Sequence, residues 1–418
     1  MENSKINISI NIILILIAFC LPLSIAITNI LSGLLILLWI FEKNWKYKYQ
    51  KLKHSKPFWI YSFFILLLGL SLIWSDTLYG NFWYKHENNA LIGYFRYYIF
   101  GYMIILITIT SLKIKYIRYI ISAFLSAMFI SEIVSWSIFM QFIQYKNIPS
   151  SDPSAFMHHS LYSIFLVVTI VLLLYRLKQT NKLFIRIGIY LFLFSAILNL
   201  FYNSGRLGQV VLIVILLIWY LLEHGVKIKV LISYIVAIII SLNILYQISP
   251  NFHKRLNQSI NALNDINNGN YANSSFGIRY NILHISKVLI AHKPILGYGI
   301  GADRKNLLDI SSNYKQTEFF SQLKHMHNGY LQILVDIGFV GLFLFLLFLL
   351  FLVKMPLPKH LHKLLISFIA IYLVGFIGEP LLFVRRTYDL FNLFIGIFIV
   401  LSIDYQENRK DKTLEKTT

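Results

Sequence analysis

The sequence has little charge and almost no cysteine. Of its 418 residues only 13% are charged, whereas 57% are hydrophobic. A soluble protein of this length carries roughly twice that share of charged residues. The single cysteine, Cys20, excludes a disulfide within the chain. A chain with so few charges is poorly suited to water, and we expect it to be embedded in a membrane.

Long apolar runs recur from one end of the sequence to the other. A helix needs about 20 mostly apolar residues to cross a bilayer core. The runs do not alternate with the period of two that a membrane strand requires, so they predict helices. We therefore predict an all-α polytopic membrane protein with about twelve transmembrane helices, at 8–24, 26–41, 58–74, 91–110, 119–141, 159–175, 187–202, 209–222, 230–248, 329–353, 364–378 and 389–404.

The net charge of +20 follows the predicted topology. Lysine and arginine are concentrated in alternate loops, at 43–56, 111–118, 176–186, 223–229 and 354–363, and in the C-terminal tail. Short loops rich in basic residues stay on the cytoplasmic side. Both termini are therefore predicted to be cytoplasmic. Since the basic residues are accounted for in this way, we expect no nucleic-acid partner.

One outer segment is much longer than the others. Residues 249–328 are polar and rich in asparagine, and include the helix-like stretch 279–291. Long loops usually have a function or are disordered. We predict one integral membrane domain over 1–418, with 249–328 inserted as a partly helical outer loop or cap. The charged tail at 405–418 is predicted to be disordered.

Two arginines on the predicted outer side are candidate binding residues. Arg206 opens an apolar helix in "YNSGRLGQ", and small neighbours would let an anionic group approach the helix N-terminus. An arginine that anchors the helix at the lipid headgroups is the alternative. Arg279, in "SSFGIRYNIL", follows serines typical of a helix start. Taken alone, Arg279 would be interpreted as a solvated surface charge.

Two histidines stand at the start of a strongly apolar helix, in "KHMHNGYLQILVDIG". Histidine is the side chain best suited to accept a proton near neutral pH, so His325 and His327 are candidate bases. A polar helix terminus is the alternative. We expect no metal site, because no third ligand stands at a recognisable spacing.

Other polar residues are weaker candidates. Glu132 lies within a predicted span, where an ionisable group is either functional or a partner for an arginine. His158 and His159 lie at the start of a helix, on the predicted outer side. Arg385 and Arg386 add positive charge on the same side. The sequence "GYGIGAD" at 297–303 does not have dinucleotide-binding spacing, and it predicts a tight turn or a backbone nest.

Three of these motifs resemble the O-antigen ligase and polymerase superfamily. "HMHNGYLQILVDIGFVGLFLF" is similar to the family's His-Asn signature, "PILGYGIG" to its upstream glycine-rich turn, and "NSGRLGQ" to its Ser-Gly/Arg segment. The number of spans and the single large loop also fit. The resemblance implies a fold of the GT-C type and a metal-independent glycosyltransferase without a cofactor.

In that family the donor is a glycan linked to undecaprenyl diphosphate, and the ligases transfer it to lipid A–core oligosaccharide. The resemblance implies that Arg206 and Arg279 bind the diphosphate, with Arg385 and Arg386 as further positive charges. It implies that His327 is the general base, with His325 as the alternative. It also implies the inner membrane of a Gram-negative bacterium, an active site on the periplasmic face, and contact with membrane lipids.

Two other functions stay open. An O-antigen polymerase uses the same donor with a growing glycan as acceptor; we prefer a ligase because the spacing of Arg206, Arg279 and His327 resembles the ligase pattern. A transporter of lipid-linked solutes would have inverted repeats and discontinuous helices, and the sequence displays neither clearly. The ligase reading predicts that the three residues converge on one outward-open cavity.

Overall fold

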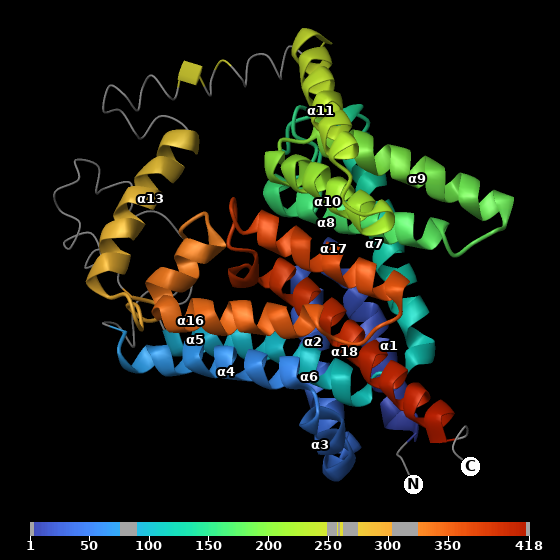
Figure 1. Cartoon of the computed structure of the whole chain (residues 1–418), viewed down its shortest axis with the longest axis vertical. Helices are drawn as coiled ribbons and strands as arrows, with labels where there is room; N and C mark the ends of the chain where they lie inside the picture. Colours follow the sequence, from blue (N-terminus) through green and yellow to red (C-terminus); the bar gives the residue numbers. More distant parts are fainter. Residues whose placement is uncertain are drawn as a thin grey trace. The chain divides into compact units, whose positions relative to one another are not determined.

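The computed structural model describes residues 4–75, 90–248, 275–302 and 325–414, and the separate positions 257, 260 and 261. Over these ranges the regular structure is helical (Figure 1). The predicted fold class, an all-α polytopic membrane protein, is confirmed.

Ten stretches of helix in the described ranges are long and apolar enough to cross a membrane. They comprise α1 (Ser4–Leu23), α2 (Ile25–Glu42), α4 (Lys56–Leu70) with η1 (Ser71–Ile73), α5 (Ala90–Tyr94) with η2 (Phe95–Ile99) and α6 (Phe100–Ser111), η3 (Ile114–Tyr116) with α7 (Ile117–Phe139), α8 (His159–Leu177), α9 (Leu183–Tyr202), α10 (Arg206–His224), α16 (Gly329–Val353) and α18 (Arg385–Leu414). The two other predicted spans coincide with α11 (Ile228–Ile248) and α17 (Lys359–Gly375). A helix thus stands at every predicted span, while the count of twelve crossings stays a prediction.

The chain divides into two compact units. The first comprises residues 1–66, 94–215 and 344–418, and the second comprises 67–93 and 216–343. In the first unit α18 packs against α6, α1 packs against α2 and α7, and α8 packs against α9 and α17. The prediction of one membrane domain over 1–418 stays a prediction.

The structure differs from the sequence expectation at the C-terminus. The tail predicted to be disordered from residue 405 continues α18 as far as Leu414. Most of the residues at 406–414 are good helix formers, and the side chain of Asn408 donates to Asp404 one turn earlier at 3.0 Å. In the predicted outer loop, the helix-like stretch at 279–291 is confirmed as part of α13 (Ser275–His292). Much of the rest of 249–328 lies outside the described residues.

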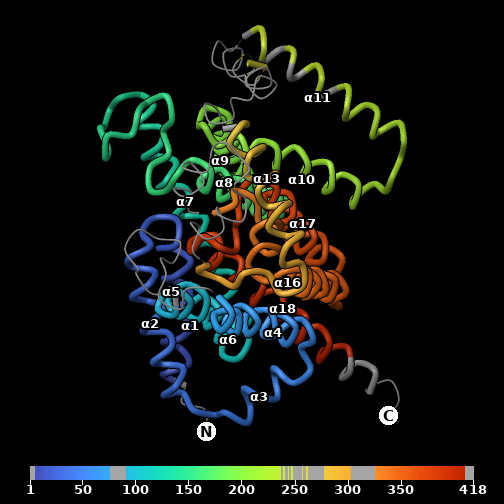
Figure 2. The backbone as a smooth tube through the Cα atoms, turned by 90° about the vertical axis from the view of Figure 1, so that its left-hand side faces the viewer, coloured from blue at the N-terminus to red at the C-terminus, as the bar shows by residue number. Residues whose placement is uncertain are grey.

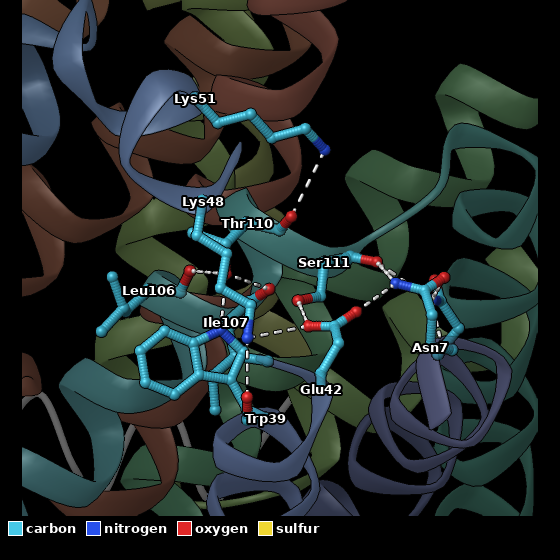
Figure 3. A network of polar contacts seen from close by, with 10 residues as sticks. Asn7, Trp39, Glu42, Lys48, Lys51, Leu106, Ile107, Thr110 and Ser111 are labelled. Atoms are coloured by element: carbon cyan, nitrogen blue, oxygen red, sulfur yellow. Dashed lines mark hydrogen bonds and ion pairs between the residues drawn. The ribbon is translucent and has the colours of Figure 1, made fainter. Parts of the chain in front are cut away.

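A buried polar network closes one end of the first unit, where α1, α2 and α6 meet (Figure 3). The amide of Asn7 donates to Glu42 at 2.7 Å and to the carbonyl of Ser111 at 3.0 Å. The hydroxyl of Ser111 donates to Glu42 at 2.6 Å. The last carbonyls of a helix have no partner within the helix. Side chains of neighbouring helices supply the partner here.

The short helix α3 (Trp45–Lys53) is attached to this network through Lys48. Figures 1 and 2 show α3 lying at the end of the α1, α2 and α6 group. The ammonium group of Lys48 lies 3.0 Å from Glu42 and donates to the carbonyl of Trp39 at 2.6 Å. Burial lowers the pKa of Lys48, although the hydrogen bond and charge of Glu42 act in the opposite direction. The pair therefore depends on both partners being present.

We predict that Glu42→Ala lowers the stability of the purified protein by about 3–5 kcal/mol, because it leaves Lys48 buried without a counter-charge. The double variant Glu42→Leu, Lys48→Met should recover much of this loss, since it removes both charges. Thermal unfolding in detergent measures the difference. Glu407→Ala, at an exposed carboxylate of α18, is the control. Equal stability of Glu42→Ala and the wild type would contradict the prediction.

Candidate active site

Arg206 is the first residue of α10, as the sequence predicted, and follows a tight turn after α9. In that turn Asn203 accepts the N–H of Gly205 at 2.6 Å. A β-carbon on Gly205 would lie 2.5 Å from the β-carbon of Ser163, in α8. The small residues therefore let α10 approach α8, a reason that the sequence reading did not foresee. The side chain of Arg206 is exposed.

A carboxylate joins the start of α8 to this turn. Asp152 accepts the N–H of Ser204 at 2.9 Å and lies 2.8 Å from Nδ1 of His159. Burial alone would raise the pKa of Asp152, but the hydrogen bonds from His159 and Ser204 outweigh it and lower the pKa. His159 was singled out in the sequence, whereas Asp152 was not. It lies in a polar loop, where no periodic pattern identifies a side chain that points inward.

His325 and His327 lie in the turn that precedes α16. His327 has a left-handed backbone conformation, with φ of +46°. Its N–H donates to Nδ1 of His325 at 3.2 Å, and the two rings lie edge to face with centroids 4.2 Å apart. Asn328 then caps α16, because its side-chain oxygen accepts the N–H groups of Tyr330 and Leu331 at 2.9 and 3.0 Å. The cap fixes the backbone on which His327 stands.

Two further side chains hold the histidine turn against α16. Gln332 accepts the N–H of Met326 at 3.0 Å and donates to Asp336 at 2.7 Å. Both side chains are buried. They were not recognised as supports from the sequence, where they stand among apolar residues. Their spacing of four, on one face of the helix, is the signal that could have identified them.

The glycine-rich turn at 297–301 completes a break in α16. Ile337 and Gly338 leave the helical conformation, and Gly338 has φ of +62° and ψ of −162°. Across this break Tyr298 and Gly299 donate to the carbonyls of Val335 and Asp336, both at 2.8 Å. The prediction of a tight turn is confirmed, since Gly297, Gly299 and Gly301 all have positive φ. The glycine-rich turn and the break in α16 therefore supply hydrogen-bond partners for each other's backbone groups.

Arg279 lies on α13, which packs against the histidine turn within the second unit. Ile282, Ile285 and Leu289 of this helix form one buried cluster with Tyr298, Met326 and Val335. The hydroxyl of Ser286 also lies 3.7 Å from the sulfur of Met326. The side chain of Arg279 is exposed at the first turns of the helix. The helix that carries Arg279 and the turn that carries His327 therefore share one core.

The two other candidate arginines, at the start of α18, contact the first unit. Arg385 is 4% exposed; its Nε donates to Asp389 at 2.8 Å, and its Nη1 lies within hydrogen-bond distance of the carbonyls of Arg96 and Tyr97. Those carbonyls belong to the π-helical segment η2. Arg386 donates to the carbonyl of Pro22 at 3.0 Å. These contacts give Arg385 a role in the fold, and diphosphate binding by either residue stays a prediction.

The candidates are divided between the two units. Arg206, Arg385 and Arg386 belong to the first unit, whereas Arg279, His325 and His327 belong to the second. The convergence of Arg206, Arg279 and His327 on one cavity stays a prediction.

We predict that Gly338→Ala destabilises the protein, because this backbone conformation is essentially restricted to glycine and a β-carbon would collide with the backbone of Ile295. Gly188→Ala is the matched control. Gly188 lies within α9, where a β-carbon would meet nothing within 4 Å. In a helix alanine is more favourable than glycine by about 1 kcal/mol. Melting temperatures should fall for the first variant and hold or rise for the second; a shared direction would refute this account.

We predict that Asp152 stabilises the fold in a pH-dependent way. Its pKa is lower in the folded chain than the unfolded value of about 3.9, so its stabilisation is complete above about pH 4 and disappears as the pH falls through the folded pKa. Acidification from about pH 6 to pH 3 should therefore lower the melting temperature of the wild type more than that of Asp152→Asn. Parallel curves for the two proteins would argue against this role.

Comparison with known proteins agrees with the resemblance seen in the sequence. Residues 188–346 match a family model described as O-Antigen ligase. No curated protein matches the chain. The matched range begins in α9 and ends in α16, so it includes the turn of Arg206, the helix of Arg279 and the cap of His327. Residues 188–346, less than half of the chain, are therefore similar to the O-antigen ligase family.

Proposed function

We propose that the protein is a glycosyltransferase that moves an O-antigen glycan from undecaprenyl diphosphate to lipid A–core oligosaccharide. The observation that carries this proposal is the family match, which includes Arg206, Arg279 and His327 in one range. Because the sugar donor has a long lipid tail, an enzyme that uses it benefits from being embedded in the membrane. The concentration of lysine and arginine in the alternate loops predicted to be cytoplasmic supports an active site on the opposite, periplasmic side.

In this proposal Arg206 and Arg279 bind the diphosphate. When the sugar leaves, negative charge gathers on the phosphate oxygen that held it. A guanidinium group can donate two parallel hydrogen bonds to a phosphate, and two such groups neutralise the charge without a metal ion. Both side chains are exposed and stand near the starts of helices, where the helix dipole also favours an anion.

His327 is the proposed general base. It would accept the proton of the acceptor hydroxyl as that oxygen forms a bond to the anomeric carbon. The bond between this carbon and the phosphate oxygen breaks in the same step, and the diphosphate leaves with the electron pair. A single displacement of this kind inverts the anomeric centre.

The contacts of the turn favour His327 over His325 as the base. Nδ1 of His325 accepts the N–H of His327 at 3.2 Å, so the lone pair of that nitrogen is engaged within the turn. A neutral His325 then carries its proton on Nε2. Protonation at Nδ1 would break the contact that shapes the turn. We therefore assign the base to His327 and a positioning role to His325.

A polymerase is the second candidate function, because it would use the same donor site with a growing glycan as acceptor. We prefer the ligase for the spacing of the two arginines and the histidine along the chain. The two functions leave different products, so a single experiment separates them.

The test is complementation of a deletion strain. We expect the wild type to restore lipid A–core capped with glycan, and Arg206→Ala, Arg279→Ala and His327→Ala to lose it while lipid-linked glycan accumulates. Loss of a general base should slow transfer by about 10²–10⁴-fold. Arg206→Lys should not restore activity, because an ammonium group cannot form the paired contact. Lipopolysaccharide gels, with membrane levels of each variant, give the readout.

Arg118→Ala is the matched control, since Arg118 is an exposed arginine whose guanidinium donates to the neighbouring Tyr119. It should support normal capping. If the deletion strain produces lipid A–core that bears a single repeat unit, the protein is a polymerase. Normal capping by all three alanine variants would exclude the proposed site.

A further inference from the structure

Glu132 lies buried in α7, about two turns before that helix ends at Phe139, and the proposed reaction does not use it. Its side chain is 1% exposed. One carboxylate oxygen accepts the hydroxyl of Ser195 at 2.5 Å, and the other has no hydrogen-bond partner. In the described part of the chain no lysine or arginine forms an ion pair with Glu132. A carboxylate at membrane depth is costly unless its charge is balanced.

The neighbouring side chains form a cluster that offers oxygen atoms. Ser131 and Ser135 lie on the same helix as Glu132, and Tyr162 of α8 faces Glu132 and both serines. The hydroxyls of Ser131 and Tyr162 are buried and make no hydrogen bond of good geometry, although Tyr162 lies close to Ser131, Ser135 and Asn199. The hydroxyl of Ser135 lies within reach of two acceptors, Oδ1 of Asn199 at 3.1 Å and the carbonyl of Pro153.

The hydroxyls of Ser131 and Tyr162 still have protons to donate, so what the cluster lacks is a positive charge to balance Glu132. The hydroxyl of Ser135 has one proton for its two acceptors, so one of those oxygens is left for another partner. Glu132 adds one carboxylate oxygen that nothing in the protein satisfies. Buried polar atoms are almost always paired, and several unpaired atoms in one place call for a ligand that the protein chain does not supply. The required ligand carries positive charge, because the carboxylate is the only charged member of the cluster.

We propose that this cluster of Ser131, Glu132, Ser135, Tyr162 and Asn199 binds one monovalent cation, either Na⁺ or a proton on Glu132. A sodium ion would be held by the free carboxylate oxygen and the neutral oxygens of the hydroxyl and amide groups, which suit a hard cation. A proton would convert the same carboxylate oxygen into a donor for one of the neighbouring hydroxyls. The buried amide nitrogens of Asn199 and Asn203 lack acceptors, which gives a role to a water molecule in either case.

The site would connect to the turn of Arg206. Asn199 lies in the last turn of α9, and its carbonyl accepts the N–H of Asn203 at 3.0 Å. On the other side Ser135 contacts Pro153, the residue next to Asp152, which accepts the N–H of Ser204. A cation bound at Glu132 thus ties α7 to both segments that form this turn. The inference does not depend on the proposed transferase activity.

Two groups of measurements on the purified full-length protein, one for sodium and one for a proton, test the proposal. The first group begins with the melting temperature in NaCl against KCl and choline chloride at equal ionic strength. For a sodium site we expect Na⁺ alone to raise it in the wild type but not in Glu132→Gln. Radioactive sodium should bind the wild type at one ion per chain. Glu407→Gln, which removes an exposed carboxylate of α18, should retain both effects.

The second group uses infrared spectroscopy, which separates a protonated carboxyl group from a carboxylate. For a proton site we expect the wild type at neutral pH to give the carbonyl band of a buried acid, absent in Glu132→Gln and retained in Glu407→Gln, with no preference for Na⁺. Ser131→Ala and Tyr162→Phe should shift that band if the site holds a proton, and should weaken sodium binding if it holds Na⁺. These two variants replace Glu132→Gln in the test if that variant does not fold. An ionised Glu132 in a protein that binds no sodium would overturn the proposal.

Discussion

A chain this apolar must pair its backbone polar groups within the protein wherever a helix ends or breaks, because lipid offers no hydrogen bonds. The break in α16 illustrates this constraint. Gly338 interrupts the helix, and the backbone of Pro294–Gly299 pairs with Val335, Asp336, Phe339 and Val340 across the gap. At the end of α6, the amides of Asn7 and Asn11 donate to the carbonyl of Ser111. In η2 the guanidinium of Arg385 takes the corresponding role.

The candidate active-site residues stand at such interruptions. Arg206 begins α10 after a turn whose backbone is held by Asn203 and Asp152, and His327 precedes the cap of α16. A polar side chain at a helix end can reach water or a lipid headgroup, whereas one in the middle of a span cannot. The hydrogen bonds that make a helix end possible in an apolar chain therefore also fix the backbone from which a catalytic group projects. In this way the constraint on folding determines where a reaction can take place.

Most of the helices, and the positions of Arg206 and His327 at helix starts, could be predicted from the sequence, because apolar length and cap residues are local signals. The supports of those residues could not. Asp152 contacts Ser204, 52 positions away, and Tyr298 pairs with Val335 through backbone atoms that leave no trace in side-chain pattern. The close approach at Gly205 and Gly208 has the same limit. A glycine signals close approach without identifying what approaches, which here is Ser163 of α8.

The same constraint applies to side chains, and the cluster around Glu132 is one place where the described part of the protein leaves it unmet. Two other buried charges among the described residues have their counter-charges nearby: Lys48 lies 3.0 Å from Glu42, and Arg385 lies 2.8 Å from Asp389. Removing one member of such a pair is strongly destabilising, because the remaining charge stays buried. Glu132 is in the position of that remaining charge, yet it belongs to the native sequence. Its hydroxyl and amide neighbours are suited to hold a mobile positive charge in place of a basic side chain. A fixed arginine would have stabilised the helices permanently, whereas a bound cation makes the packing of α7, α8 and α9 depend on the solution.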